Sequence, residues 1–183
     1  MKISEADILI APGLGNSGPD HWQRRWGARM PYARFIEQDN WDRPVLADWV
    51  ACIHQEIMFS TRPVVLIGHS MSVGAIVIAA RTLVDTKVRG AFLVSPPDFA
   101  ADTIPPEARP FAPPTDPLPF PSMVVASTTD PLVSVPRARG FAADWGADFQ
   151  LAGDAGHINA ASGHGPWPEG LLMLGELLKR LRA

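Results

Sequence analysis

The chain has 183 residues, of which 46% are hydrophobic and 19% charged, a balance typical of one globular domain with a sizeable core. Its formal net charge of −3 argues against nucleic acid or an anionic membrane as a partner, since neither would be attracted to its surface. Cys52 is the only cysteine, which excludes an intrachain disulfide and a cysteine metal cluster.

The first residues do not read as a targeting signal. Glu5 and Asp7 lie where a secretory signal peptide would have its apolar core. No uncharged apolar stretch is long enough to cross a bilayer. By default, we therefore expect a cytoplasmic protein without a membrane partner.

Short apolar runs alternate with longer amphipathic segments. The runs predict strands at residues 7–11, 33–36, 63–67, 88–94, 123–126 and 147–151. The amphipathic segments predict helices at residues 20–29, from about Pro44 to beyond Ile53, and at 73–84, 134–145 and 170–182. This alternation predicts an α/β fold, with a mostly parallel central sheet of about six strands and helices on both faces. We expect a single domain over residues 1–183, without a separate cap domain.

Residues 95–121 depart from the alternation. They hold about half of the chain's 19 prolines, show little periodicity, and look too polar and proline-rich for a core element. We expect an irregular excursion over the carboxyl edge of the sheet, where ligands bind in folds of this class. Two interpretations stay open, a lid over the site and a plain surface linker.

The strongest local signal is the sequence Gly68-His69-Ser70-Met71-Ser72, between an expected strand and an expected helix. This context is typical of a nucleophile elbow, in which a sharp turn exposes the serine and its second neighbours on both sides must be small. Ser70 is therefore the candidate nucleophile. Ser72 stands where glycine is usual, and we expect slight crowding that Gly74 and Ala75 ease.

A serine hydroxyl needs a base, and the chain has five histidines. His157 follows the last expected strand in a glycine-containing loop that can reach back to Ser70, so we favour it over His164, which lies farther from the strand end. The other three have different expected positions: His54 inside a helix, His69 beside the serine with its side chain pointing away from the reaction centre, and His21 where it could line the site.

The acid that orients the base is predicted at Asp130. It follows the strand at 123–126, which gives the chain order Ser, Asp, His expected for this fold. Asp98, after the strand at 88–94, is the alternative acid. Asp130 could also serve only as a turn residue before Pro131.

The oxyanion hole is expected to use the backbone N–H of Met71 and a second donor from the loop Gly13-Leu14-Gly15, with Leu14 preferred to Gly15. Trp22, Trp41, Phe111 and Phe120 could form an apolar acyl pocket, although each would more commonly be a packing residue. We expect no metal and no organic cofactor. The candidate substrate-binding residues are Gly13, Gly15, His21, Trp22 and His69.

With these residues placed, the chain resembles a known family, the small serine hydrolases related to retinoblastoma-binding protein 9 and the bacterial YdeN proteins. The resemblance runs nearly end to end and is carried by the segments Pro12-Gly13-Leu14-Gly15-Asn16-Ser17-Gly18-Pro19-Asp20-His21-Trp22-Gln23, Gly68-His69-Ser70, Asp130-Pro131, Gly156-His157-Ile158-Asn159, Ser162-Gly163, Gly165-Pro166-Trp167-Pro168 and Gly170. It implies a compact α/β-hydrolase core and a Ser-Asp-His triad, whose roles fall on Ser70, Asp130 and His157.

The chain departs from the family in a second place besides Ser72. The mammalian member is named for binding the retinoblastoma protein through a Leu-x-Cys-x-Glu element. Around Cys52 this chain has Val50 and His54 at the outer positions, so that binding is not expected here.

The residues predict acyl transfer to water on a small ester, thioester or amide. Perhydrolysis and carbon–carbon cleavage occur on the same fold and stay open, because the fold does not determine the substrate. The alternative outside enzymology is a catalytically silent protein that binds a ligand or a regulatory partner, for which a complete-looking triad would serve no purpose.

Overall fold

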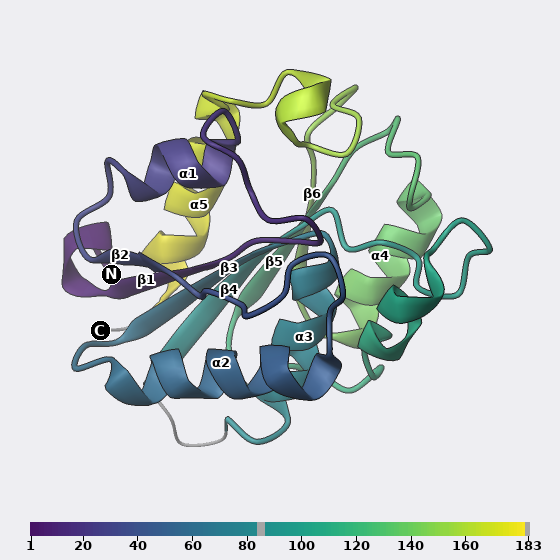
Figure 1. Ribbon diagram of the computed structural model, residues 1–183. Helices are drawn as coiled ribbons and strands as arrows, with labels where there is room; N and C mark the ends of the chain where they lie inside the picture. The colour runs from purple at the N-terminus through teal and green to yellow at the C-terminus, as the bar shows by residue number, and fades with distance from the viewer. Residues whose placement is uncertain (84–86, 182–183) are drawn as a thin grey trace.

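The computed structural model describes residues 1–83 and 87–181 of the chain (Figure 1). Its centre is one six-stranded sheet in the order β2-β1-β3-β4-β5-β6, and every neighbouring pair is parallel. The strands are β1 (Asp7–Ala11), β2 (Ala33–Phe35), β3 (Val64–His69), β4 (Val88–Val94), β5 (Ser122–Ala126) and β6 (Asp148–Leu151). The predicted α/β fold with about six strands is confirmed.

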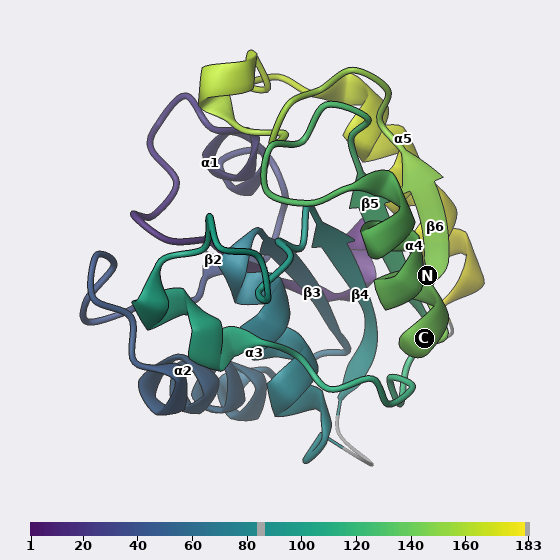
Figure 2. The same ribbon diagram turned by 90° about the vertical axis from the view of Figure 1, so that its right-hand side faces the viewer.

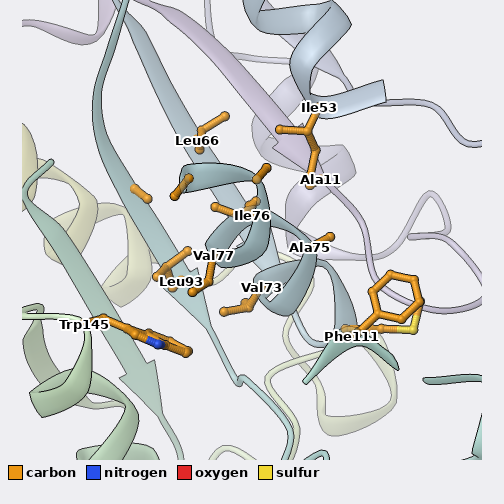
Figure 3. Close-up of a cluster of buried hydrophobic side chains, with 14 of the residues drawn as sticks. Ala11, Ile53, Leu66, Val73, Ala75, Ile76, Val77, Leu93, Phe111 and Trp145 are labelled. Atoms are coloured by element: carbon orange, nitrogen blue, oxygen red, sulfur yellow. The ribbon is translucent and has the colours of Figure 1, made fainter. Parts of the chain in front are cut away.

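Helices cover both faces of the sheet, as Figure 1 shows. On one face lie α1 (Trp22–Gly27) and α5 (Pro168–Arg180), and on the other lie α2 (Leu46–Phe59), α3 (Met71–Ala80) and α4 (Val135–Asp144). The single-residue alternation of a strand divides the core between the two faces. Ile8 and Ile10 of β1 pack with α1 and α5, whereas Leu9 and Ala11 pack in the cluster of α2, α3 and α4 (Figure 3).

The helices begin and end within a few residues of the predicted limits, and the differences have local causes. Helix α1 begins at Trp22 because His21 has extended backbone and caps it. Helix α3 begins at Met71, directly after the turn at Ser70, and not at residue 73. The ends predicted for the helices 73–84 and 170–182 lie outside the described residues; the structure ends α3 at Ala80 and α5 at Arg180. None of the described helices has the length and hydropathy needed to span a membrane.

Residues 95–121 differ from the expectation of a segment too polar for the core. They include a 3-10 helix, Pro106–Phe111, that packs against α3. Figure 2 shows the segment running in front of α3. The apolar residues of this segment are scattered among prolines and show no periodicity. Five of these apolar residues are nevertheless buried: Phe99, Ile104, Ala108, Phe111 and Phe120. Proline restricts the unfolded chain, so an irregular segment can still pack at a modest entropic cost.

Candidate active site

Ser70 sits in a sharp turn between β3 and α3. Its backbone has φ 57° and ψ −128°, a conformation that L-residues rarely adopt outside strained functional turns. The backbone N–H of Ser70 donates to the carbonyl of Val94 on β4, which ties the turn to the sheet. A Cβ on Gly68 would lie 2.7 Å from Cδ1 of Ile76, so α3 can follow the strand closely only if this position is glycine.

Ser72 does not behave as the crowded replacement for glycine that the sequence suggested. Its buried hydroxyl accepts from the N–H of His69 at 3.0 Å and is 2.7 Å from the carbonyl of Ala11, to which it donates. The hydroxyl therefore joins the end of β1 to the turn, just where the strand ladder between them ends at Ala11 and Gly68. Gly74 also differs from expectation: it makes room for Phe111, whose carbonyl oxygen would lie 2.1 Å from a Cβ there.

The structure brings the three predicted catalytic side chains together. Nε2 of His157 lies 2.8 Å from Oγ of Ser70, and Nδ1 lies 2.9 and 3.0 Å from the two carboxylate oxygens of Asp130. A carboxylate can only accept, so Nδ1–H donates to Asp130 and Nε2 is left to accept the serine proton. The side chain of Asp130 is 0% exposed and that of His157 is 12% exposed, which keeps water away from their contact.

Hydroxyl groups behind the pair hold the loops of Asp130 and His157 together. Oγ of Ser127 accepts from the N–H of Ala155 at 3.0 Å, and Oγ1 of Thr129 accepts from the N–H of Gly156 at 3.0 Å. Thr129 also donates to the carboxylate of Asp154 at 2.6 Å. These residues had no role predicted from the sequence, although a run of serine and threonine directly after a strand is a signal for side-chain to backbone bonding.

The alternative acid and base lie elsewhere. Asp98 pairs with Nε of Arg137 at 3.2 Å. His164 packs edge-on against Trp167 and contacts Oγ of Ser162 at 3.1 Å. His54 on α2 contacts Oγ1 of Thr82 at 3.0 Å.

His21 and His69 form a row of rings with His157. The centroid of the His69 ring is 4.9 Å from that of His21 and 5.0 Å from that of His157. From the sequence we expected the His69 side chain to point away from the reaction centre. That expectation is wrong, because the His69 ring packs against the ring of His157 and lines the hollow. Burial, and then the neighbouring His157, lower the pKa of His21 from 6.5 to about 4, and the same causes with His21 added hold the pKa of His69 well below its ordinary value. Both rings are therefore neutral at pH 7.

A hollow of about 240 Å³ opens beside Ser70 and His157. Three of the five predicted substrate-binding residues, Gly13, His21 and His69, line it, as does Leu14. The lining residues to which the sequence analysis assigned no role are Asn16, Gly18, Asn159, Ala160 and Ala161. Asn16, Gly18 and Asn159 belong to the segments that carry the family resemblance, whereas Ala160 and Ala161 had no sequence signal.

The remaining two predicted substrate-binding residues are not on the wall of the hollow. Trp22 is fully buried in the core, where its Nε1–H donates to the carbonyl of Ile158 at 2.8 Å. Gly15 donates its N–H to the carbonyl of Trp41 at 3.0 Å, which also removes it as the second oxyanion donor. Phe111 and Phe120 are buried core residues and Trp41 packs against that core, so these aromatic residues have the packing role that was considered the more common one and do not form an acyl pocket.

The two backbone N–H groups predicted as oxyanion donors come from two different segments of the chain. Met71 is the first residue of α3, where a backbone N–H has no carbonyl of its own helix to bond. Leu14 lies in the loop after β1, and its N–H makes no hydrogen bond within the described part of the chain. Gly13 sets the distance between loop and serine, because a Cβ there would lie 3.0 Å from Cβ of Ser70.

Comparison with known proteins identifies the family of the chain. A sequence profile described as "Serine hydrolase" matches residues 8–176. The chain belongs to the serine hydrolase family. No curated protein sequence gives a significant match.

Among solved structures, this serine hydrolase is similar to a YdeN-like hydrolase from Pectobacterium atrosepticum, with 35% identity and a TM-score of 0.85 over 96% of this chain and 92% of that one. It is also similar to the ydeN gene product of Bacillus subtilis, with 20% identity and a TM-score of 0.79 over 96% and 100% of the two chains. An esterase domain from Rhodothermus marinus shares the fold at 15% identity and a TM-score of 0.69, over 96% and 87%.

Proposed function

We propose that this protein hydrolyses a small ester, thioester or amide by acyl transfer through Ser70, with His157 as base and Asp130 as the acid that orients it. The observation that carries the proposal is the continuous contact from Ser70 Oγ to His157 Nε2 at 2.8 Å and from His157 Nδ1 to Asp130 at 2.9 Å. These contacts join three residues that lie far apart in the chain, at the carboxyl edge of the sheet.

The chemistry follows from the atoms in contact. Oγ of Ser70 attacks the substrate carbonyl carbon while its proton passes to Nε2 of His157, and Asp130 stabilises the resulting imidazolium. The carbonyl oxygen becomes an oxyanion, which the backbone N–H groups of Met71 and Leu14 bind. The intermediate then expels the leaving group, which takes the proton from His157.

The second half of the reaction repeats these roles with water. Water attacks the acyl-serine carbonyl and gives a proton to His157, and the carboxylic acid leaves as Ser70 recovers its proton. The hollow beside Ser70 is below the 300–1,000 Å³ range of drug-sized ligand pockets, which favours small substrates.

Labelling with a fluorophosphonate tests the nucleophile and the base. We expect the wild-type protein to be labelled and Ser70→Ala not to be. His157→Ala should lose at least about a thousandfold in rate, whereas the matched variant His164→Ala should stay close to wild type. Hydrolysis of short p-nitrophenyl esters should follow the same order. Labelling that persists in Ser70→Ala, or is lost in His164→Ala, would contradict the assignment.

A further inference from the structure

His21 has one ring nitrogen engaged and one unused. As the cap of α1, it accepts the N–H of Gln23 on Nδ1 at 3.2 Å. An accepting Nδ1 carries no proton, so in the neutral ring the proton is on Nε2. Burial first, and His157 second, lower the pKa of His21 to about 4, so the ring is neutral at pH 7.

The Nε2–H of His21 has no hydrogen-bond partner within the described residues, and His21 lines the hollow. No residue in the described ranges accepts a hydrogen bond from it, although His21 is only 6% exposed. The fully buried side-chain atoms that lack a partner in the described residues do not include Nε2 of His21, so this atom keeps some solvent exposure. His21 also lines the hollow beside Ser70. A nearly buried donor that remains reachable from a cavity is placed to bond a group that enters the cavity.

The surroundings indicate what such a group is. Among the described residues, no Asp, Glu, Lys or Arg side chain lines the hollow; the polar ones are Ser70, two asparagines and three histidines, with Leu14 and two alanines beside them. A neutral donor in a neutral, small hollow matches a neutral acceptor oxygen and offers no counter-charge for a carboxylate.

We propose that His21 is a specificity-determining residue whose Nε2–H bonds an acceptor oxygen that the substrate carries within a few atoms of the scissile carbonyl. The site then selects small esters with a hydroxy, alkoxy or second carbonyl group over their hydrocarbon isosteres. A substrate that lacks the oxygen leaves the donor unpaired, which is the larger part of such discrimination. This inference rests on the proposed function of Ser70.

Two isosteric pairs of esters test the selection. One pair changes the acyl group, p-nitrophenyl methoxyacetate against p-nitrophenyl butyrate, and the other changes the alcohol, 2-methoxyethyl acetate against butyl acetate. His21→Ser keeps a good helix cap and removes the donor. We expect the ratio of kcat/KM for the oxygen-containing ester to that for its isostere to fall about three- to tenfold in at least one pair.

The matched control is His54→Ser, the same replacement on α2 outside the site, in which both ratios should equal those of wild type. Equal losses on both members of each pair in His21→Ser would show a purely structural role and overturn the inference.

A second readout does not depend on turnover. Side-chain ¹H–¹⁵N spectra of the wild-type protein at pH 7 should show His21 as the neutral Nε2–H form. A charged ring or the Nδ1–H form would overturn the inference even if Ser70 is labelled and esters are hydrolysed. Failure of labelling with the expected His21 form would instead count against the proposed function.

Discussion

Nε2 of His69 lies 2.9 Å from the backbone carbonyl of His157. A carbonyl only accepts, so the ring of His69, the residue before Ser70, donates to the backbone of His157, whose own ring contacts Ser70. His69 and Ser70 are neighbours in the turn between β3 and α3. The bond from His69 therefore holds the loop of His157 in position relative to Ser70. The bond requires a proton on Nε2 of His69. Because the pKa of His69 is lowered, the donor is the neutral ring with its proton on Nε2.

Replacing His69 should weaken catalysis through His157. His69→Phe keeps an aromatic ring but cannot donate, and we expect kcat to fall about fivefold or more with a smaller change in KM. His69→Gln retains a donor and should recover part of the loss. Steady-state kinetics on a short p-nitrophenyl ester measures both, and equal activity of the Phe and Gln variants would show that the bond is unimportant.

Replacing Gly13 should lower the activity. In Gly13→Ala the new Cβ would press on Cβ of Ser70 and on the carbonyl of His69, each 3.0 Å away, and we expect about a tenfold or greater loss of kcat/KM. Gly140→Ala on α4 is the control, because its Cβ meets no atom within 4 Å. Activity in Gly13→Ala equal to that of the control would contradict the role given to this position.

The hydroxyl of Ser72 should stabilise the protein. Ser72→Ala removes the buried partner of the His69 N–H and one of two donors to the carbonyl of Ala11, which keeps Nε2 of Gln23, and we expect a loss of about 1–3 kcal/mol in the free energy of unfolding, measured with urea. Ser72→Gly restores the usual residue of the elbow and should lose at least as much. A Gly variant more stable than wild type would support crowding instead.

The two neutral histidines should make stability depend on pH. The folded pKa of His21, about 4, is below its unfolded value of 6.5, so the unfolded chain binds the proton more readily. The contribution of the neutral His21 ring to the free energy of unfolding is therefore complete above pH 6.5 and is lost as the pH falls toward 4. The difference corresponds to roughly 3 kcal/mol for His21, and His69 adds in the same direction.

Urea unfolding between pH 7.5 and 4.5 measures this slope. His21→Ser should show a shallower decline in the free energy of unfolding than wild type over that range. The same slope in both proteins would mean that His21 is not held neutral by the fold.

Two glycines inside helices should respond in opposite ways to alanine. Gly74→Ala on α3 places a Cβ 2.1 Å from the carbonyl oxygen of Phe111, and we expect about 3 kcal/mol or more of destabilisation as residues 95–121 are displaced. Gly175→Ala on α5 meets nothing within 4 Å and should stabilise by about 0.5–1 kcal/mol, because alanine favours the helix. Thermal unfolding compares them, and a neutral Gly74→Ala would show that the segment packs loosely there.

The sequence by itself determined the strands, the helices and their α/β order, because hydrophobic periodicity and the small residues of the elbow are local properties. It also pointed to Ser70, Asp130 and His157, since each follows a strand and the carboxyl ends of parallel strands share one edge. The burial of apolar side chains in residues 95–121 could not be predicted from the sequence, because these side chains are scattered among prolines without periodicity.

Only the tertiary structure decided which side chains meet. Whether Asp130 or Asp98 reaches His157 depends on loop paths, and Asp98 is taken by Arg137. The use of the Ser72 hydroxyl, the row of three rings and the burial of Trp22 depend on contacts between segments far apart in the chain. Such contacts leave no local pattern, because the free energy of a side chain's placement is set by neighbours that the fold brings from elsewhere.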